Sequence, residues 1–425
     1  MPALPDTPAA PRRHARFQWS AQTQCFCGAE RLDLGAGDAE SAPKANETPQ
    51  QINTRTLRAL YRGLRDGHEI RMTSDGVDLL PTTPPFTPSL QCQTSGSGGA
   101  PKAIRRSHAS WIASFEINRA RFPLTAEDSY AVLGRLMHSL ALYATLEAAH
   151  IGADLHLLAD LRPATQRRLM AQAGVTALYA TPAQLKLLLR AEATPLPALR
   201  RIICGGGFLD ADLRAALAQD LPHVVILEFY GASETSFITL TDAQTPQGSV
   251  GCAYPQVEIK IAPLDGEAQI GETKIGEVWV KSPYLFEGYA MGESAETRWQ
   301  DGFLTVGELG WLDPQGYLYL AGRKRRMVLI ADQNTFPEEI ENFLLAQAGV
   351  AHCAVIAQPD PARGHHLVAV IGGPRDKDLA ATLDTASRAE FGPLKAPKRY
   401  IFMEDFPCLA SGKPDMAALA LRIDG

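Results

Sequence analysis

The sequence lacks any apolar run that approaches the length of a membrane span, and it has no excess of positive charge. Its 425 residues carry 41 Lys and Arg against 47 Asp and Glu, so the net charge is −6. That balance leaves no overall basic surface for nucleic acid. The first residues, Met1 to Arg13, are rich in Pro and Ala and lack the apolar core of a signal peptide. We therefore expect no membrane and no nucleic-acid partner.

Cysteine is scarce as well, with seven residues spread widely along the chain. An odd, scattered set does not form a disulfide framework and is typical of a reducing compartment, so we expect a cytoplasmic protein. Cys25 and Cys27 could form half of a metal site, but no second Cys or His pair follows at ligand spacing. We interpret them as ordinary thiols.

The composition that remains is that of a globular protein, with 45% hydrophobic and 21% charged residues. A chain of this length is too long for one core and predicts two or three domains. From residue 103 to 265 helix-like and short strand-like runs alternate, which predicts a layered α/β domain. Beyond residue 265 the pattern becomes strand-like, and after Arg323 a small domain reads as strand, helix, strand.

Several local signals place the elements. Ser107 is a candidate N-cap for a helix through Trp111 and Phe115, and Gly152 is a candidate stop for the apolar run that begins near His138. Further signals are a helix over 56–65 that ends at Gly67, a capping box at Thr181-Pro182-Ala183-Gln184, buried strands over 201–204 and 224–229, and a helix from Pro337 that stops at Gly349.

The chain is organised around Thr94-Ser95-Gly96-Ser97-Gly98-Gly99-Ala100-Pro101-Lys102. Glycines allow the backbone to turn its N–H groups inward, and such a concavity binds anions; the hydroxyls and Lys102 add donors and positive charge. The spacing is not that of a Walker loop. A flexible surface loop is the alternative for this composition alone.

Two further motifs follow strands. Gly205-Gly206-Gly207 comes directly after the strand over 201–204, and Tyr230-Gly231-Ala232-Ser233-Glu234 follows the next one. The second motif presents an aromatic face, a hydroxyl and a carboxylate together. Alone, Glu234 would be read as a solvated acid at a strand end.

Taken in order, these segments resemble the acyl-adenylate-forming (AMP-dependent synthetase/ligase) superfamily, which includes acyl- and aryl-CoA ligases, luciferases and peptide-synthetase adenylation domains. Residues 94–102 resemble T-S-G-S-x-G-x-P-K, and 230–234 resemble Y-G-x-[TS]-E. Val306 to Gly310 resembles T-G-D-L, Gly322-Arg323 the junction G-R, and Pro407 to Lys413 the P-x-T-x-S-G-K tail.

The resemblance implies roles for individual residues. Lys413 would stabilise the charge that spreads between the attacking carboxylate and the α-phosphate, Glu234 would hold Mg²⁺, and His138 would lie beside the acid pocket. The residues implied in ATP and AMP binding are Thr94, Ser95, Gly96, Ser97, Gly98, Gly99, Lys102, Gly205, Gly206, Gly207, Tyr230 (stacked on adenine), Gly231, Ser233, Glu308 (on the ribose) and Arg323.

The chain departs from the family pattern at several positions. Gly98 stands where the family has Thr or Ser, Glu308 replaces Asp, and Ala331 and Asp332 replace two glycines. The phosphate loop begins unusually early, so we expect a domain truncated at its front. No acid accompanies His138 in the sequence, which disfavours an α-amino acid as substrate.

The resemblance therefore implies an α/β fold with an N-terminal domain over 1–322 and a small mobile α+β domain over 323–425. The implied reaction is ATP- and Mg²⁺-dependent conversion of an aryl or acyl acid to acyl-AMP and pyrophosphate, followed by transfer to a phosphopantetheine thiol. The acceptor is CoA or an acyl carrier protein. The run Lys324-Arg325-Arg326 is either a solvated basic turn or a docking patch that would favour an acidic carrier protein. The alternative function is a degenerate nucleotide-binding homologue without ligase activity.

Overall fold

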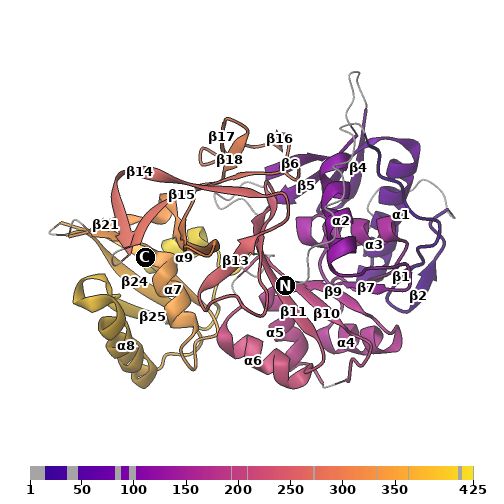
Figure 1. The fold of residues 1–425 in the computed structure, drawn as a ribbon. Coiled ribbons are helices and arrows are strands. Elements are labelled where there is room, and N and C mark those ends of the chain that lie inside the picture. The colour runs from indigo at the N-terminus through magenta and orange to yellow at the C-terminus, as the bar shows by residue number, and fades with distance from the viewer. Residues whose placement is uncertain are drawn as a thin grey trace.

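The fold is that of a computed structural model (Figure 1). It describes residues 15–35, 46–81, 88–94, 102–192, 194–207, 209–270, 273–331, 333–361, 363–409 and 414–424, with the side chains of 94, 265–270 and 424 left aside. Within these residues, no helix is both long and apolar enough to cross a bilayer.

A run of parallel strands forms the centre of the larger part of the chain. The central strands of this run are short and almost wholly buried, as expected when helices cover both faces of a sheet. The neighbours, in spatial order, are β1 (Cys25–Cys27), β8 (Asp154–Leu157), β7 (Ser129–Val132), β9 (Ala177–Ala180), β10 (Arg201–Cys204) and β11 (Val225–Ala232).

Helices pack on both faces of these strands (Figure 1). Along β10, Ile202 and Ile203 point into different hydrophobic clusters, because successive side chains of a strand alternate between faces. One cluster contains α1 (Pro49–Asp66), α2 (His108–Arg121) and α3 (Ser139–Ile151); the other contains α4 (Pro163–Gln172), α5 (Pro182–Arg190) and α6 (Ala211–Asp220).

The predicted helix boundaries are confirmed where a cap defines them. Ser107 caps α2, Thr181 and Gln184 form the capping box of α5, and Gly67 and Gly152 end α1 and α3 with left-handed φ. Helix α1 begins at Pro49, earlier than expected, because Thr48 forms a second capping box with Gln51.

Beyond β11 the sheet becomes antiparallel, earlier than the sequence pattern indicated. The chain turns back at once into β12 (Ser236–Leu240), which pairs antiparallel with β11. The strands that follow across the sheet are β13 (Ser249–Ala253), β20 (Tyr317–Arg323), β19 (Glu308–Leu312), β15 (Thr273–Lys281), β18 (Phe303–Thr305) and β17 (Arg298–Gln300); β14 (Glu258–Ile270) pairs with β15, and β2 (Glu30–Leu32) with β1.

A second sheet carries the strands that flank residues 95–101. Strand β5 (Ser89–Thr94) and strand β6 (Lys102–Ser107) pair antiparallel, so Thr94 and Lys102 lie opposite each other. Strands β16 (Gly288–Met291), β3 (Glu69–Thr73) and β4 (Gly76–Leu80) complete this sheet.

The C-terminal part has its own core and confirms a small α/β unit after a large one. The expected order of strand, helix and strand omits several of its elements, and α7 (Pro337–Leu345) ends before Gly349. Its elements are β21 (Val328–Ile330), β22 (Gln333–Thr335), α7, β23 (Cys353–Asp360), β24 (Gly364–Gly372), α8 (Lys377–Lys395), β25 (Arg399–Met403) and α9 (Met416–Asp424). The boundary at 322/323 falls within β20, so it stays a prediction.

Candidate active site

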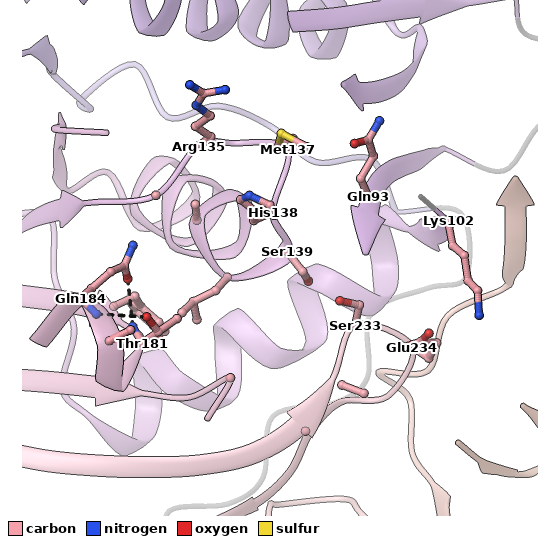
Figure 2. Close-up of a pocket in the computed structure, with 18 of the residues that line it drawn as sticks. Gln93, Lys102, Arg135, Met137, His138, Ser139, Thr181, Gln184, Ser233 and Glu234 are labelled. Carbon is pink, nitrogen blue, oxygen red and sulfur yellow. Dashed lines mark hydrogen bonds between the residues drawn. The ribbon is translucent and has the colours of Figure 1, made fainter. Parts of the chain in front are cut away.

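A cavity of about 740 Å³ lies where the parallel strands end and the second sheet approaches them. Loops after β7, β8, β9, β10 and β11 all contribute to its wall, which is where ligands bind in open α/β sheets. The predicted residues that line it are Lys102, His138, Gly206, Gly231, Ser233, Glu234, Glu308 and Arg323. Figure 2 shows several of them, with His138 and Ser139 between Thr181 on one side and Glu234 on the other.

The remaining predicted site residues fall into two groups. Ser95, Gly96, Ser97, Gly98, Gly99 and Lys413 lie outside the described residues, as does the side chain of Thr94. Gly205, Gly207 and Tyr230 are described but do not line the cavity. A Cβ at Gly205 would lie 2.3 Å from the ring of Phe229, so this glycine permits close packing, and Tyr230 packs against the cluster around Ile238.

Ser233 and Glu234 project from the tight turn between β11 and β12. A Cβ at Gly231 would lie 1.9 Å from the carbonyl oxygen of Ser236, so only glycine lets the two strands approach this closely. The backbone N–H of Ala232 donates to Oγ1 of Thr235 at 2.9 Å and closes the turn. The sequence predicted a strand end here; the structure gives a hairpin tip that faces the cavity.

Glu234 has a partner that the sequence did not reveal. The hydroxyl of Tyr289 donates to Oε1 of Glu234 at 2.8 Å and lies 2.9 Å from Oγ1 of Thr297. The ammonium of Lys102 lies 5.7 Å from the centre of the Tyr289 ring. Tyr289 therefore orients the carboxylate at the edge of the cavity. It follows Glu234 by 55 positions, too far for a local motif.

The single carboxylate of Glu234 fits a magnesium ion whose other ligands are water and substrate phosphates. No group of three or more His, Cys, Asp or Glu residues able to hold a metal is found among the described residues. Mg²⁺ prefers one or two carboxylates together with water and substrate phosphates. The carboxylate of Glu234, oriented by Tyr289 in a cavity that Lys102 also lines, matches that chemistry.

Glu308 and Arg323 form a pair across neighbouring strands. They lie directly opposite each other in the β19–β20 register, and Nε of Arg323 donates to Oε1 of Glu308 at 3.1 Å. Burial alone would lower the pKa of Arg323, but the charge and hydrogen bond of Glu308 outweigh it and the pKa is raised. Burial, and then the charge of Glu308, raises the pKa of Tyr230 well above its usual value.

His138 lies at the N-cap of α3 without capping the helix through its side chain. Its position is fixed by the preceding loop, because the N–H of Gln93 donates to the carbonyl of Met137 at 3.1 Å. Burial, and then the charge of Arg135, lowers the pKa of His138. Both effects favour the neutral imidazole.

The sequence around His138 contains no acid, but the fold brings one close to it. Asp160, from the loop after β8, lines the same cavity, although it is distant in sequence. Its carboxylate is already paired, with Nε of Arg135 at 2.7 Å from Oδ2 of Asp160. The fold thus places an acid near His138, but Arg135 already forms an ion pair with it.

Carboxylates from distant elements reach all three cations of the Lys324-Arg325-Arg326 run, so the run carries less unpaired charge than the sequence indicates. Lys324 lies 4.0 Å from Glu277, and Arg325 lies 3.6 Å from Glu296. Arg326 forms two hydrogen bonds with Glu341, at 2.7 and 2.9 Å, and another to the carbonyl of Val355. The sequence of this run contains the three cations, but the carboxylates that pair with them lie elsewhere in the chain.

Ala331 adopts a left-handed backbone with φ of 48°, at a position where the resemblance gives glycine. Its N–H donates to the carbonyl of Arg363 at 2.9 Å, which holds the turn in place. Asp332, the second replaced glycine, lies outside the described residues. The left-handed turn is thus kept without the residue that adopts it most easily.

Cys25 and Cys27 are buried within β1. Burial raises the pKa of Cys25 to about 12 and that of Cys27 to about 11, so both remain protonated thiols at neutral pH. Protonated thiols are poor nucleophiles and poor metal ligands. Their interpretation as ordinary core residues agrees with this environment.

Two family profiles match the chain: AMP-binding enzyme over residues 28–290, and AMP-binding enzyme C-terminal domain over residues 339–413. Among curated relatives, the uncharacterised acyl-CoA ligase YhfT of Bacillus subtilis (strain 168) is 36% identical over 341 residues, which cover 79% of this chain and 69% of YhfT. The 2-succinylbenzoate–CoA ligase of Enterococcus faecalis is 29% identical over 326 residues, covering 75% of this chain and 66% of the ligase.

Among solved structures, ATP-bound MatB from Rhodopseudomonas palustris superposes with a TM-score of 0.68 at 27% identity, covering 78% of this chain and 67% of MatB. The o-succinylbenzoate CoA synthetase MenE of Bacillus subtilis, bound to an acyl-adenylate, has the same fold, with a TM-score of 0.67 at 24% identity. The chain spans about two thirds of the length of the curated relatives it matches. It belongs to the AMP-binding enzyme family, as an acid–thiol ligase homologous to acyl-CoA ligases.

Proposed function

We propose that this enzyme converts an aryl or acyl carboxylic acid to its CoA thioester in two steps. First, a carboxylate oxygen attacks the α-phosphorus of ATP, the bond to the β-phosphate oxygen breaks, and pyrophosphate leaves. Then the thiol sulfur of CoA attacks the acyl carbon, its proton is lost, and AMP leaves with the former carboxylate oxygen.

The observation that supports this proposal is the single cavity of about 740 Å³, which gathers residues from three separate motifs. Lys102 ends the phosphate loop, and Glu234 adds a carboxylate. The Glu308–Arg323 pair joins the neighbouring strands β19 and β20 at the cavity wall. A nucleoside triphosphate requires a cation for its phosphates, a carboxylate that binds its metal ion, and a carboxylate that accepts hydrogen bonds from its ribose hydroxyls. No catalytic nucleophile of the protein is required, because the work is positioning and charge stabilisation.

Each group has a stated task in this scheme. Lys102 and Ser233 bind phosphate oxygens, Glu308 accepts hydrogen bonds from the ribose hydroxyls, and Arg323 orients Glu308 through its hydrogen bond. Mg²⁺ held at Glu234 would offset the negative charge of the phosphates. Lys413, placed by sequence alone, would enter between the acid and the α-phosphate and stabilise the charge that develops on both.

The cavity wall also bears on the acid. Val132, Leu133, Leu140 and Leu187 give it apolar surface near His138. An α-ammonium group would need a free carboxylate there, and Asp160 is committed to Arg135. These features favour an apolar aryl or acyl acid over an α-amino acid.

For the acceptor we favour CoA over an acyl carrier protein. The relatives quoted above are named as CoA ligases. The argument for a carrier protein depended on an unpaired basic patch, and carboxylates pair all three of its cations. Direct assay with CoA and with a phosphopantetheinylated carrier protein decides between them.

The test of the proposed function is acid-dependent exchange of labelled pyrophosphate into ATP, over a panel of aryl and acyl acids. We expect exchange with at least one acid, and product thioester when CoA is added. ATP binding without exchange for any acid would overturn the proposal. That result would instead establish a degenerate nucleotide-binding homologue. Gly98 and Ala331, which depart from the family pattern, are the features that favour this alternative.

A further inference from the structure

Trp299 is a large apolar side chain on β17, a strand at the edge of the large sheet, and it is 50% exposed. One exposed indole on a protein surface is ordinary. Trp299, however, stacks on the ring of Phe286, which is only 3% exposed; the two centroids lie 6.1 Å apart and the planes differ by 8°. Offset stacking of this kind stabilises a pair beyond the area that it buries. The indole therefore covers and restrains a ring of the interior.

Phe286 in turn contacts two residues of the candidate magnesium site. Its backbone N–H donates to the carbonyl oxygen of Glu234 at 2.9 Å. Its ring meets the ring of Tyr289 edge to face, with centroids 5.1 Å apart and an angle of 81° between the planes. Tyr289 is the residue whose hydroxyl donates to the carboxylate of Glu234. Phe286 thus holds the metal-binding acid through the main chain and its orienting tyrosine through the ring.

The chain segment that carries Trp299 also contacts Tyr289 directly. Burial, and then the charge of Glu234, raises the pKa of Tyr289, so its hydroxyl keeps the proton that it donates to Glu234. A phenol has one such proton. Thr297 therefore donates in the 2.9 Å bond between its Oγ1 and the Tyr289 oxygen. Tyr289 belongs to the second sheet, so the segment 297–299, at the edge of the large sheet, holds a side chain that comes from the other sheet.

We propose that Trp299 is a positioning residue for the magnesium site and acts on Glu234 through Phe286 and Tyr289. The inference rests on the proposed function, because the metal is the one that accompanies ATP in that reaction. Trp299 is not among the described residues that line the large cavity, so its effect on the metal passes through its neighbours. Mg²⁺ requires nearly ideal octahedral geometry, and a carboxylate that is poorly aligned binds the ion less well. Loss of the indole exposes Phe286 and loosens both of its contacts with the site.

The test compares Trp299→Ala, which removes the stacked ring, with Trp299→Phe, which keeps one. We expect Trp299→Ala to raise the Mg²⁺ concentration for half-maximal pyrophosphate exchange about threefold, and Trp299→Phe to restore most of that loss. The exchange rate at saturating Mg²⁺ should stay within about twofold of the wild type, because the ion is bound again. Trp299→Leu, an apolar cover without a ring, replaces Trp299→Ala if thermal unfolding shows that the latter does not fold.

Trp311→Ala is the matched control. It also removes a partly exposed indole that is stacked on another ring, since Trp311 lies parallel to Tyr319 with centroids 5.1 Å apart and planes that differ by 6°. Neither residue is among those that line the large cavity within the described part of the chain. The Mg²⁺ dependence of Trp311→Ala should match that of the wild type. An equal shift in Trp311→Ala and Trp299→Ala would assign the effect to general loosening of the fold and overturn the proposal.

A double-mutant cycle tests the route through Tyr289. If Trp299 acts partly through Tyr289, Trp299→Ala should add little once Tyr289→Phe has removed the hydrogen bond to Glu234. The shift in half-maximal Mg²⁺ of the double variant should therefore be smaller than the product of the two single shifts. Shifts that multiply would show that the two residues act independently, which contradicts the proposed route.

Metal binding gives a readout that does not depend on catalysis. Mn²⁺, used in place of Mg²⁺, can be titrated into the full chain with a non-hydrolysable ATP analogue, and electron paramagnetic resonance measures the free ion. The Kd for Mn²⁺ should rise about threefold in Trp299→Ala and stay near the wild-type value in Trp299→Phe and Trp311→Ala. An unchanged Kd in folded Trp299→Ala would overturn the proposal. If exchange fails with every acid, the proposed function fails, whereas the Mn²⁺ titration still tests Trp299.

Discussion

Arg323 and Glu308 lie directly opposite each other on β20 and β19, with Nε of Arg323 3.1 Å from Oε1 of Glu308. The pair fixes one carboxylate at the wall of the cavity. A directly opposed pair of this kind is positioned by the strand register, so its geometry is set before a nucleotide arrives.

Removing the charge of Glu308 tests this arrangement. Glu308→Gln should raise the KM for ATP by about tenfold or more, because a hydrogen bond to a charged group contributes about 1.5–3 kcal/mol. Glu308→Asp restores the shorter acid of the family pattern and is the matched control, with a smaller effect expected. Pyrophosphate exchange at varied ATP concentration measures both. Equal KM values in Glu308→Gln and the wild type would show that the pair is structural.

Glu234→Gln tests the magnesium assignment. We expect most exchange activity to be lost, with the remainder requiring a higher Mg²⁺ concentration, because an amide is a weaker ligand than a carboxylate. Tyr289→Phe removes only the hydrogen bond that orients Glu234 and should cause a smaller loss, with a modest shift in Mg²⁺ dependence. Exchange by Glu234→Gln that matches the wild type at limiting Mg²⁺ would contradict the assignment.

Lys413→Ala should reduce adenylation by about 100-fold or more while sparing transfer from a preformed acyl-AMP to CoA. The reason is that the charge stabilised by Lys413 develops in the first step. Separate assays of the two half-reactions measure this. A parallel loss in both would assign Lys413 a structural role and would also remove the argument for a C-terminal domain that moves between steps.

Ala331→Gly should stabilise the C-terminal part by about 0.5–1 kcal/mol, since it relieves the cost of a left-handed alanine and loses part of that gain to chain entropy. Ala346→Gly, at the end of α7 with φ of −81°, is the control and should destabilise instead. Thermal unfolding of both variants beside the wild type gives the comparison. A lower midpoint for Ala331→Gly would contradict the predicted strain.

Glu147 predicts a pH-dependent stability. Burial raises its pKa to about 7, although hydrogen bonds from Tyr179 and Asn118 oppose the shift. The pKa in the unfolded chain is about 4.3. The folded state therefore binds more protons between these values, and this residue's contribution to stability falls as pH rises from about 4.5 to 7, by up to about 1.4 kcal/mol per pH unit.

Glu147→Gln should remove that contribution. Unfolding measured at intervals from pH 4.5 to 8 should give a difference between wild type and Glu147→Gln that changes up to about pH 7 and is constant above it. Parallel pH profiles across the whole range would show that the carboxyl of Glu147 has the same pKa in both states.

Local signals predicted local structure. Thr181 and Gln184 form the expected capping box, Ser107 caps its helix, and Gly152 ends α3, because each depends on residues a few positions apart. The large cavity also collects described residues from separate motifs, such as Lys102 and Glu234, which their order along the chain had suggested.

Contacts between distant segments were not predictable in the same way. Tyr289 reaches Glu234 only because β16 joins the sheet of β5 and β6, and Asp160 reaches Arg135 because β8 lies beside β7. The counter-charges of the basic run could not be predicted for the same reason, since Glu341, which pairs with Arg326, comes from α7. A cation can be recognised from its own position in the chain, but its partner requires the fold.

The place of β1 in the parallel sheet determines when that sheet can be completed. The backbone N–H of Gln24 donates to Asp154, 130 positions away, and Phe26 stacks on His156, so one edge of β1 pairs with β2 at once but the other has no partner until β8 has been made. At about 5–20 residues per second, that is a delay on the order of ten seconds during synthesis. Until then the edge of β1 that will pair with β8 is open to other strands. Pairing of β8 with β1 thus closes an edge that stays open while the 130 residues between them are made.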